Sequence, residues 1–210
     1  MARSEVLREL RNHIAPVTLA REHCLAVPGP LAPLLPRDGI QKGQTLGFAG
    51  SGSWSIALAM AGAAVGNDGW LAIVNAPEVG LCAAGELGVD LERVLVIESV
   101  PGDRIPTALA AMNETIDLIL LGPHPPLSHR DVRRLSARNR ERGTVIFHLD
   151  SGRNWPSPLD ISFTVTNSRW FGLGDGHGYL QWRQLDVEAT GRRAAAQTRR
   201  ASIALPELGS

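Results

Sequence analysis

The residues best suited to chemistry lie in a glycine-rich stretch, Gly47 to Ile56, with the sequence GFAGSGSWSI. A phosphate-binding loop follows a strand and opens a helix, and it carries a glycine, four residues, a second glycine, a lysine and a hydroxyl residue. Gly47 and Gly52 match the two glycines, but Ser53 replaces the lysine and Trp54 replaces the hydroxyl residue. The stretch therefore offers no ammonium group for the β- and γ-phosphates and no hydroxyl ligand for Mg²⁺.

Two interpretations of this loop remain open. Backbone N–H groups survive side-chain substitution, so Gly50, Ser51, Gly52 and Ser53 could still bind a nucleotide weakly. The alternative, which we favour, is a plain strand-to-helix turn in which Trp54 packs over the vacated pocket. If the loop is a plain turn, we expect no cofactor. If it binds a nucleotide, we expect ATP with Mg²⁺.

Arginines form a second group of candidates, for binding DNA or a protein partner. In the stretch 128–142, which we expect to be helical, arginines recur every four residues and make one basic stripe. The stripe and a neighbouring arginine comprise Arg130, Arg133, Arg134, Arg138 and Arg142. The stripe could contact DNA phosphates or an acidic partner segment, or it could be an ordinary solvated helix face.

The C-terminal arginines have the same two interpretations. They are Arg192, Arg193, Arg199 and Arg200. Here we favour an arm that becomes ordered when it binds a partner or nucleic acid. Trp170 and Phe171 lie beside a glycine-rich segment, which predicts an exposed protein-binding surface. The histidines are irregularly spaced, so we expect no metal site.

The composition narrows the class of protein. The chain has 210 residues, enough for one domain with a sizeable core, and its 21 basic residues balance 21 acidic ones. Cys24 and Cys82 are far apart and lack metal-ligand spacing, so we expect buried, reduced thiols. No apolar run approaches the roughly 18 residues of a membrane span. We therefore expect a cytoplasmic protein without a membrane partner.

The loop is positioned by a regular alternation of predicted strands and helices. The predicted strands cover 45–50, 70–76, 94–99, 117–121 and 144–149, and the predicted helices cover 54–65, 78–87, 103–114 and 128–142. Their near-continuous apolar character indicates an α/β fold in three layers, with a mostly parallel sheet covered on both faces. Two further strands, at 161–170 and 179–190, predict a C-terminal antiparallel hairpin at a sheet edge.

We expect three segments along the chain. Residues 1–26 form an N-terminal helical segment with an amphipathic helix at 4–14, residues 27–190 form the core domain, and residues 191–210 form a basic, disordered tail. The N-terminal helix could dock on a partner, on a second copy of this chain in a homo-oligomer, or on its own core.

The order of these pieces resembles the RecA-type core. After the second strand, the segment Glu86 to Val96 contains a leucine-glycine-valine-aspartate turn that enters the next strand, as in RecA. Within that superfamily the chain resembles the RecA-like accessory proteins of bacterial mutagenic cassettes, the ImuA type in its actinobacterial form ImuA′. The C-terminal segments that carry this likeness are SRW at 168–170, GLG at 172–174, GHG at 176–178 and QLDVEA at 184–189. The likeness covers roughly residues 25–190.

Most catalytic positions of the RecA family are altered here. The family's lysine falls on Ser53, its Mg²⁺-binding hydroxyl on Trp54, and its Walker B acid on Gly122. Its catalytic acid falls on Glu78 or, less well, on Asn75. Because these cations stabilise the transition state of phosphoryl transfer, their loss predicts a pseudo-ATPase, not an enzyme.

The resemblance implies a non-catalytic adaptor in the SOS response to DNA damage. It implies binding to an ImuB-type Y-family-like protein, support of a C-family polymerase in error-prone translesion synthesis, and association with RecA, DNA and the nucleoid. Two alternatives remain open: an ATP-dependent RecA-family DNA-binding ATPase with an unusual phosphate loop, or a SulA-like inhibitor of cell division.

Overall fold

The computed structural model describes residues 24–149, 155–174 and 177–206. The predicted helix at 4–14 lies outside the described residues. Of the helices in the described ranges, none has both the length and the apolar character that a membrane crossing needs.

An eight-stranded sheet forms the centre of the molecule, in the order β10-β9-β8-β3-β7-β6-β4-β5. Its strands are β3 (Thr45–Ala49), β4 (Leu71–Val74), β5 (Val94–Ile97), β6 (Leu118–Leu121), β7 (Val145–Leu149), β8 (Ile161–Gly174), β9 (His177–Gly191) and β10 (Arg199–Leu205). All neighbours from β8 to β5 pair in parallel, and β9 pairs antiparallel with both β8 and β10. The predicted α/β class, with a mostly parallel sheet and an antiparallel hairpin, is confirmed. A separate two-stranded sheet joins β1 (Cys24–Leu25) to β2 (Ile40–Gln41).

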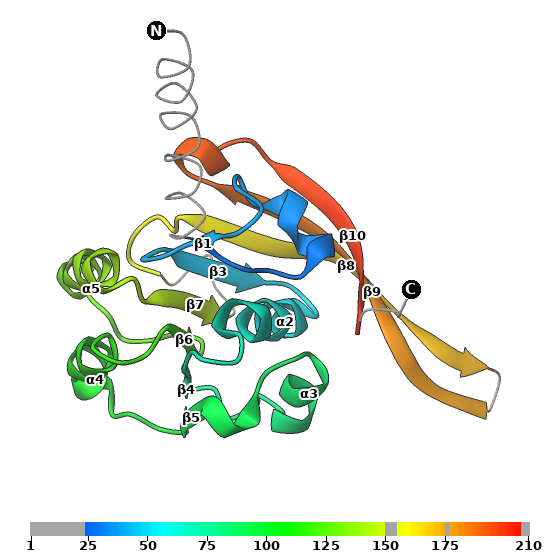
Figure 1. Cartoon of the computed structure of the whole chain (residues 1–210), viewed down its shortest axis with the longest axis horizontal. Coiled ribbons are helices and arrows are strands. Elements are labelled where there is room, and N and C mark those ends of the chain that lie inside the picture. Colours follow the sequence, from blue (N-terminus) through cyan, green and yellow to red (C-terminus); the bar gives the residue numbers. More distant parts are fainter. Residues whose placement is uncertain (1–23, 150–154, 175–176, 207–210) are drawn as a thin grey trace, which may run out of the picture.

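Helices cover both faces of the sheet (Figure 1). The α-helices are α2 (Ser53–Val65), α3 (Leu81–Glu86), α4 (Ile105–Met112) and α5 (His129–Arg142), and the 3-10 turns are η1 (Gly29–Leu34), η2 (Leu91–Arg93), η3 (Gly102–Arg104) and η4 (Arg193–Ala195). Strand β6 is apolar at every position because both of its faces are buried. Leu118 and Leu120 join the core under α2, whereas Ile119 and Leu121 join the core under α4 and α5. Successive side chains of a strand point to opposite faces, and here both faces are buried.

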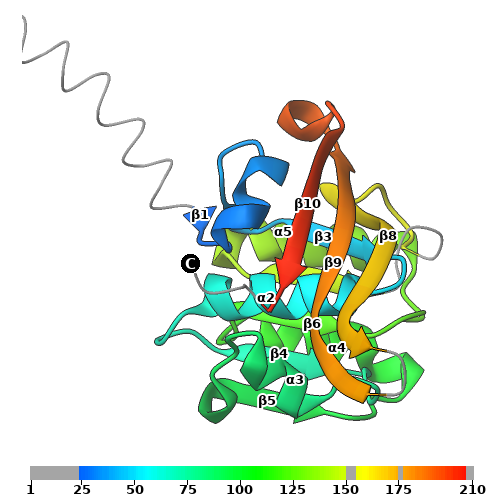
Figure 2. The same cartoon turned by 90° about the vertical axis from the view of Figure 1, so that its right-hand side faces the viewer.

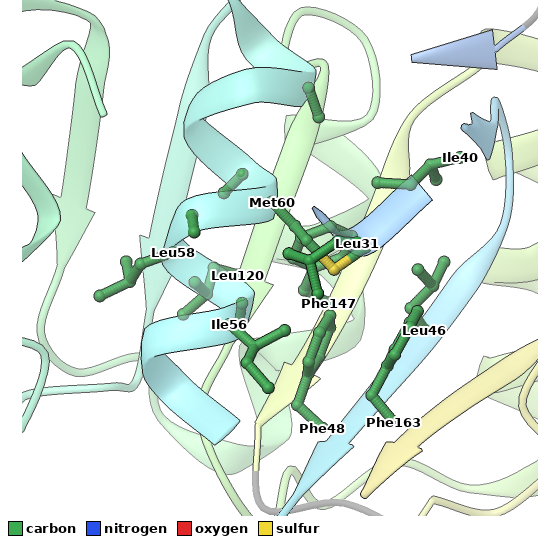
Figure 3. Packing of buried hydrophobic residues seen from close by; sticks show 14 of the residues in the cluster. Leu31, Ile40, Leu46, Phe48, Ile56, Leu58, Met60, Leu120, Phe147 and Phe163 are labelled. Carbon is green, nitrogen blue, oxygen red and sulfur yellow. The ribbon is translucent and has the colours of Figure 1, made fainter. Parts of the chain in front are cut away.

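Three phenylalanines hold the centre of the larger core (Figure 3). The Phe48 ring of β3 stacks on Phe163 of β8 with centroids 5.1 Å apart, and it contacts Phe147 of β7 at 4.9 Å. Leu31 of η1 and Met60 of α2 complete this cluster. The strand that leads into the glycine loop is therefore fixed by its neighbours on both sides.

The hairpin of β8 and β9 is longer than predicted and projects beyond the body of the molecule (Figure 1). In the turned view it faces the reader and lies in front of the rest of the chain (Figure 2). We call its outer part, residues 166–174 and 177–183, the arm. Strand β8 has two bulges, one between Val165 and Asn167 and one between Phe171 and Leu173. Such bulges increase the local twist and turn a strand away from the sheet.

Two predictions were wrong. The segment after residue 190 is not a disordered tail in its described part, because Arg199 to Leu205 form β10 and pair with β9. Ile203 and Leu205 are buried in the core and Ala204 between them is less so, as expected for a strand with one face on the core; the arginines at the start of the segment obscured this signal. Cys82 is exposed and Cys24 only partly buried, so the expected burial of both thiols is not found.

Candidate functional site

The glycine loop lies at the carboxyl end of the central strand β3 and leads directly into α2. Gly50 and Gly52 adopt φ values of +91° and +97°, a region that favours glycine. The N–H of Ser53 donates to the Gly50 carbonyl at 3.1 Å, and Ser53 is 2% exposed. Trp54 is half-buried against the larger core cluster. The turn thus uses one of its own N–H donors, buries Ser53 and packs Trp54 on the core.

Strands of the hairpin cross directly over this loop. A Cβ on Gly50 would collide with the carbonyl oxygen of Val165 in β8. A Cβ on Gly52 would lie 2.7 Å from Cδ2 of Leu185 and 2.9 Å from Cζ of Arg183, both in β9. The glycines are therefore required for close approach of protein backbone and side chains, independently of any phosphate.

Arg183 occupies the surface of the loop. Its Nε donates to Oγ of Ser168 at 2.5 Å, and its Nη2 donates to Oγ of Ser51 at 2.9 Å. Its guanidinium also lies 5.1 Å from the ring centroid of Trp170. Partial burial lowers the pKa of Arg183 below its ordinary value, yet an arginine keeps its charge.

No local pattern predicts a role for Arg183, which lies 132 residues from Ser51. Only the packing of β9 on β3 through β8 brings it to the loop. It brings a positive charge to a loop that contains no lysine, but two of its donor groups are committed to serine hydroxyls. The arrangement works as a joint that holds the arm to the core, and we refer to it as the loop–arm joint: Gly50, Ser51, Gly52, Val165, Ser168, Trp170, Arg183 and Leu185.

The position expected for a Walker B acid has no room for one. Gly122 follows β6, and its N–H donates to the Val74 carbonyl at 2.8 Å. A Cβ at Gly122 would overlap the backbone carbonyl of Asn75. Asn75 has φ +50°, and its side chain accepts from the N–H of Val100 at 2.7 Å and donates to the Val100 carbonyl at 3.2 Å. The two hydrogen bonds to Val100 therefore hold Asn75, and with it the obstructing carbonyl, in place.

The other predicted site residues are only partly brought together. Glu78 is exposed in a turn and makes no hydrogen bond or ion pair with the described residues. On α5, Arg138 and Arg142 both pair with Glu114, at 3.0 and 2.7 Å. Arg130, Arg133 and Arg134 are exposed and form no ion pair within the described ranges. The arginines in the C-terminal half of the predicted basic stripe thus share one carboxylate, whereas those in its N-terminal half are unpaired among the described residues.

The C-terminal arginines belong to the folded edge of the sheet. Arg192 pairs with Asp160 at 3.0 Å, and Arg200 pairs with Glu188 at 2.5 Å. Arg199 lies in β10 beside it. The expectation that Arg199 and Arg200 belong to a C-terminal segment that becomes ordered only on binding is therefore wrong. Arg193 is exposed and has no ion-pair partner among the described residues.

The arm exposes large apolar side chains. Trp170 is 48% exposed, as predicted, and Tyr179 and Leu180 on the opposite strand are 72% and 49% exposed. Phe171 instead stacks on Trp182, with centroids 4.0 Å apart and an interplanar angle of 5°. Tyr179 and Leu180 were missed, although their place after the glycine-rich turn was a signal that could have found them.

The described histidines, cysteines and carboxylates form no group of three that could hold a metal ion. The fold and the loop define the class: an α/β protein whose central glycine loop has the position, but not the side chains, of a phosphate-binding loop. The chain belongs to the MT3502 N-terminal domain family, whose model matches residues 33–157. That range includes the loop and Gly122 but ends before β8, so the arm lies outside it.

The chain is also similar to the uncharacterized protein Rv3395c of Mycobacterium tuberculosis (strain ATCC 25618 / H37Rv). The two are 34% identical over 101 residues, which cover 48% of this chain and 49% of that protein. The chain thus spans about half the length of this curated relative.

Proposed function

We propose that this protein is a non-catalytic RecA-like adaptor of the ImuA type, acting in damage-induced, error-prone translesion synthesis. In this role it binds an ImuB-type Y-family-like protein and supports the C-family polymerase that works with it. The sequence resemblance supplies the partner. The geometry of the loop supports an adaptor in preference to an ATPase.

The loop–arm joint is the observation that carries the proposal. A working phosphate loop leaves its N–H groups and its lysine open to the nucleotide. Here Arg183 lies against Gly52 and bonds Ser51, so protein atoms cover the loop. Gly122 excludes a Mg²⁺-binding acid on the neighbouring strand. Neither feature disturbs the fold, and the contacts of Arg183 with the loop anchor the arm.

The arm is the surface that we assign to the protein partner. Trp170, Tyr179 and Leu180 present apolar area on an element that projects from the body. Exposed aromatic residues of this kind are the side chains that dominate binding energy when a partner buries them. The Phe171–Trp182 stack stiffens the same segment, which lowers the entropy lost on binding.

A binding experiment with purified ImuB-type protein tests the proposal. Truncation near residue 190 is unsuitable, because it removes β10 from the sheet. Tyr179→Ala combined with Leu180→Ala removes apolar surface of the arm without touching the core or the loop–arm joint, and we expect at least about a tenfold loss of affinity, since each hot-spot residue is worth about 1–2 kcal/mol or more.

The matched control is Trp70→Ala, which removes a tryptophan that is 43% exposed at the start of β4 and far along the sheet from the arm. We expect this variant to bind within about twofold of the unaltered protein. Equal loss in both variants would reject the arm as the binding surface. Calorimetric titration with ATP and Mg²⁺ tests the competing function: tight Mg²⁺-dependent binding with turnover would overturn the adaptor.

A further inference from the structure

A basic hollow of about 390 Å³ lies at the opposite end of the sheet from the glycine loop. Its lining comes from the turn before β3, from the last turn of α5, and from the segments just before β8 and just after β9. Gln44 and Asp160, which precede two parallel strands, place it at the amino ends of β3 and β8. It is therefore distinct from the loop–arm joint.

Close backbone contacts build this hollow. Gly43 has φ +83°, and a Cβ there would lie 2.7 Å from Cα of Arg140. Its N–H also donates to the Gly143 carbonyl at 3.3 Å. Only glycine lets the turn beside Lys42 lie this close to the end of α5, and this contact sets Lys42 and Arg140 on one rim.

Asp160 fixes the floor. One carboxylate oxygen accepts from the N–H of Thr45 at 2.9 Å, and the other accepts from Nη2 of Arg192 at 3.0 Å. Backbone bonds from Asp160 to Thr45 and to Arg192 reinforce both contacts. The one carboxylate in the lining is thus already engaged by an N–H group and by a cation.

Cations dominate the rest of the lining: Arg37, Lys42, Arg140, Arg192 and Arg193. Apart from Arg192, none of them forms an ion pair with the described residues, and all are exposed. Lys42 is the chain's single lysine, and the chain as a whole is electrically neutral. Arg193 also has φ +55°, a left-handed conformation that costs about 1–2 kcal/mol for a side chain of this kind. A concentration of unpaired charge held partly by strained backbone calls for an anionic ligand.

We propose that this hollow binds the phosphate backbone of DNA. Arginine forks and a lysine are the groups that contact phosphates. The lining holds no aromatic side chain on which a base could stack, so contacts would be to phosphates and independent of sequence. The choice of DNA over an acidic peptide rests on the proposed function, which places the protein at damaged DNA.

Fluorescence anisotropy with a labelled oligothymidylate of about 30 nucleotides tests this proposal, over a salt range of about 50–200 mM. The test variant combines Lys42→Ala, Arg140→Ala and Arg193→Ala. Each lost phosphate contact lowers the salt slope by about 0.7 for single strands, so we expect a slope smaller by about 2 and affinity at least about tenfold weaker.

A second triple variant tests the rival DNA site, the free half of the α5 stripe, which lies outside the hollow: Arg130→Ala, Arg133→Ala and Arg134→Ala. We expect it to keep most of the affinity and the slope. Equal loss in the two triple variants, or unchanged binding in the first, would overturn the proposal. So would an oligoglutamate peptide of matched charge that binds more tightly than the oligonucleotide at the same salt.

Thermal unfolding of both variants checks that these exposed substitutions leave the fold intact. The DNA-binding experiment contains no protein partner. A negative result would therefore reject the DNA site in the hollow but would not contradict the proposed adaptor function. Conversely, loss of ImuB binding in the arm variants says nothing about the hollow. The two proposals therefore fail separately.

Discussion

Substitution of Gly122 by alanine tests the claim that the protein cannot carry an acid at this position. The added Cβ would overlap the Asn75 carbonyl, and Gly122 lacks a left-handed φ, so the contact and not the dihedral angle is the obstacle. Overpacking costs about 1–3 kcal/mol in cores whose side chains can yield. Here the obstacle is a backbone carbonyl whose residue is clamped to Val100, which favours the upper limit.

The unfolded chain offsets part of that cost. Replacing glycine by alanine removes conformational freedom from the unfolded state and stabilises the folded state by about 0.4–1 kcal/mol. The expected net loss for Gly122→Ala is therefore about 2–3 kcal/mol, which corresponds to a decrease in Tm of about 5–10 °C for a chain of this size. Circular dichroism during heating, with urea unfolding for the free energy, measures both quantities.

Gly29→Ala is the matched control. A Cβ at Gly29 would meet no atom within 4 Å, and its φ is not left-handed. We expect its free energy of unfolding to stay within about 0.5 kcal/mol of the unaltered protein. If Gly122→Ala were as stable as Gly29→Ala, the segment would have room for a side chain, and the absence of an acid would have no steric cause.

Three further outcomes follow from the same geometry. Asn75→Ala loses both bonds to Val100 and places alanine at φ +50°, so it should be less stable than Asn75→Gly by about 1 kcal/mol in urea unfolding; equal stability would mean that the dihedral angle is unimportant. Arg183→Lys replaces the donors Nε and Nη2 by a single nitrogen that does not reproduce the guanidinium fork, so it should lose about 1–3 kcal/mol of unfolding free energy and change the tryptophan fluorescence; an unchanged spectrum would separate Arg183 from Trp170. Hydrogen bonds from Ser128 hold the pKa of Asp131 below its ordinary value of 3.8, so this cap of α5 stabilises the fold at pH above 3.8 and is lost as the pH falls through the lower, folded-state pKa. An NMR titration of the Asp131 carboxyl group should show this pKa rising towards 3.8 in Ser128→Ala, and no rise would reject the cap as its cause.

The parallel core could be predicted from the sequence because its signals are local. Strands such as Leu118–Leu121 are apolar at every position, which only burial on both faces explains. The helix at His129–Arg142 begins with the capping residues Ser128 and Asp131 and ends at Gly143. The strand Arg199–Leu205 was missed because it is only seven residues long, opens with two arginines and shows no clear alternation of apolar and polar residues.

The candidate sites were harder to predict because they depend on contacts between distant segments. The difference from a phosphate-binding loop can be read from the sequence, because Ser53 and Trp54 stand where such a loop carries a lysine and a hydroxyl residue. The engagement of that loop by Arg183 depends on the order of strands, which no local pattern encodes. The basic hollow likewise joins Lys42, Arg140 and Arg193, three residues that no sequence period connects.

A lysine at position 53 would not by itself make the loop a phosphate site. The contacts around the loop make it a structural joint instead. Ser53 is 2% exposed, so a lysine there must bury its ammonium group or displace its surroundings. Any nucleotide at the loop would also have to displace Arg183 from Ser51 and Ser168, which would release the arm from the core. Binding a phosphate and holding the arm are therefore competing uses of the same loop. The glycines at positions 50 and 52 serve the second use in this structure, since they let Val165 and Arg183 approach.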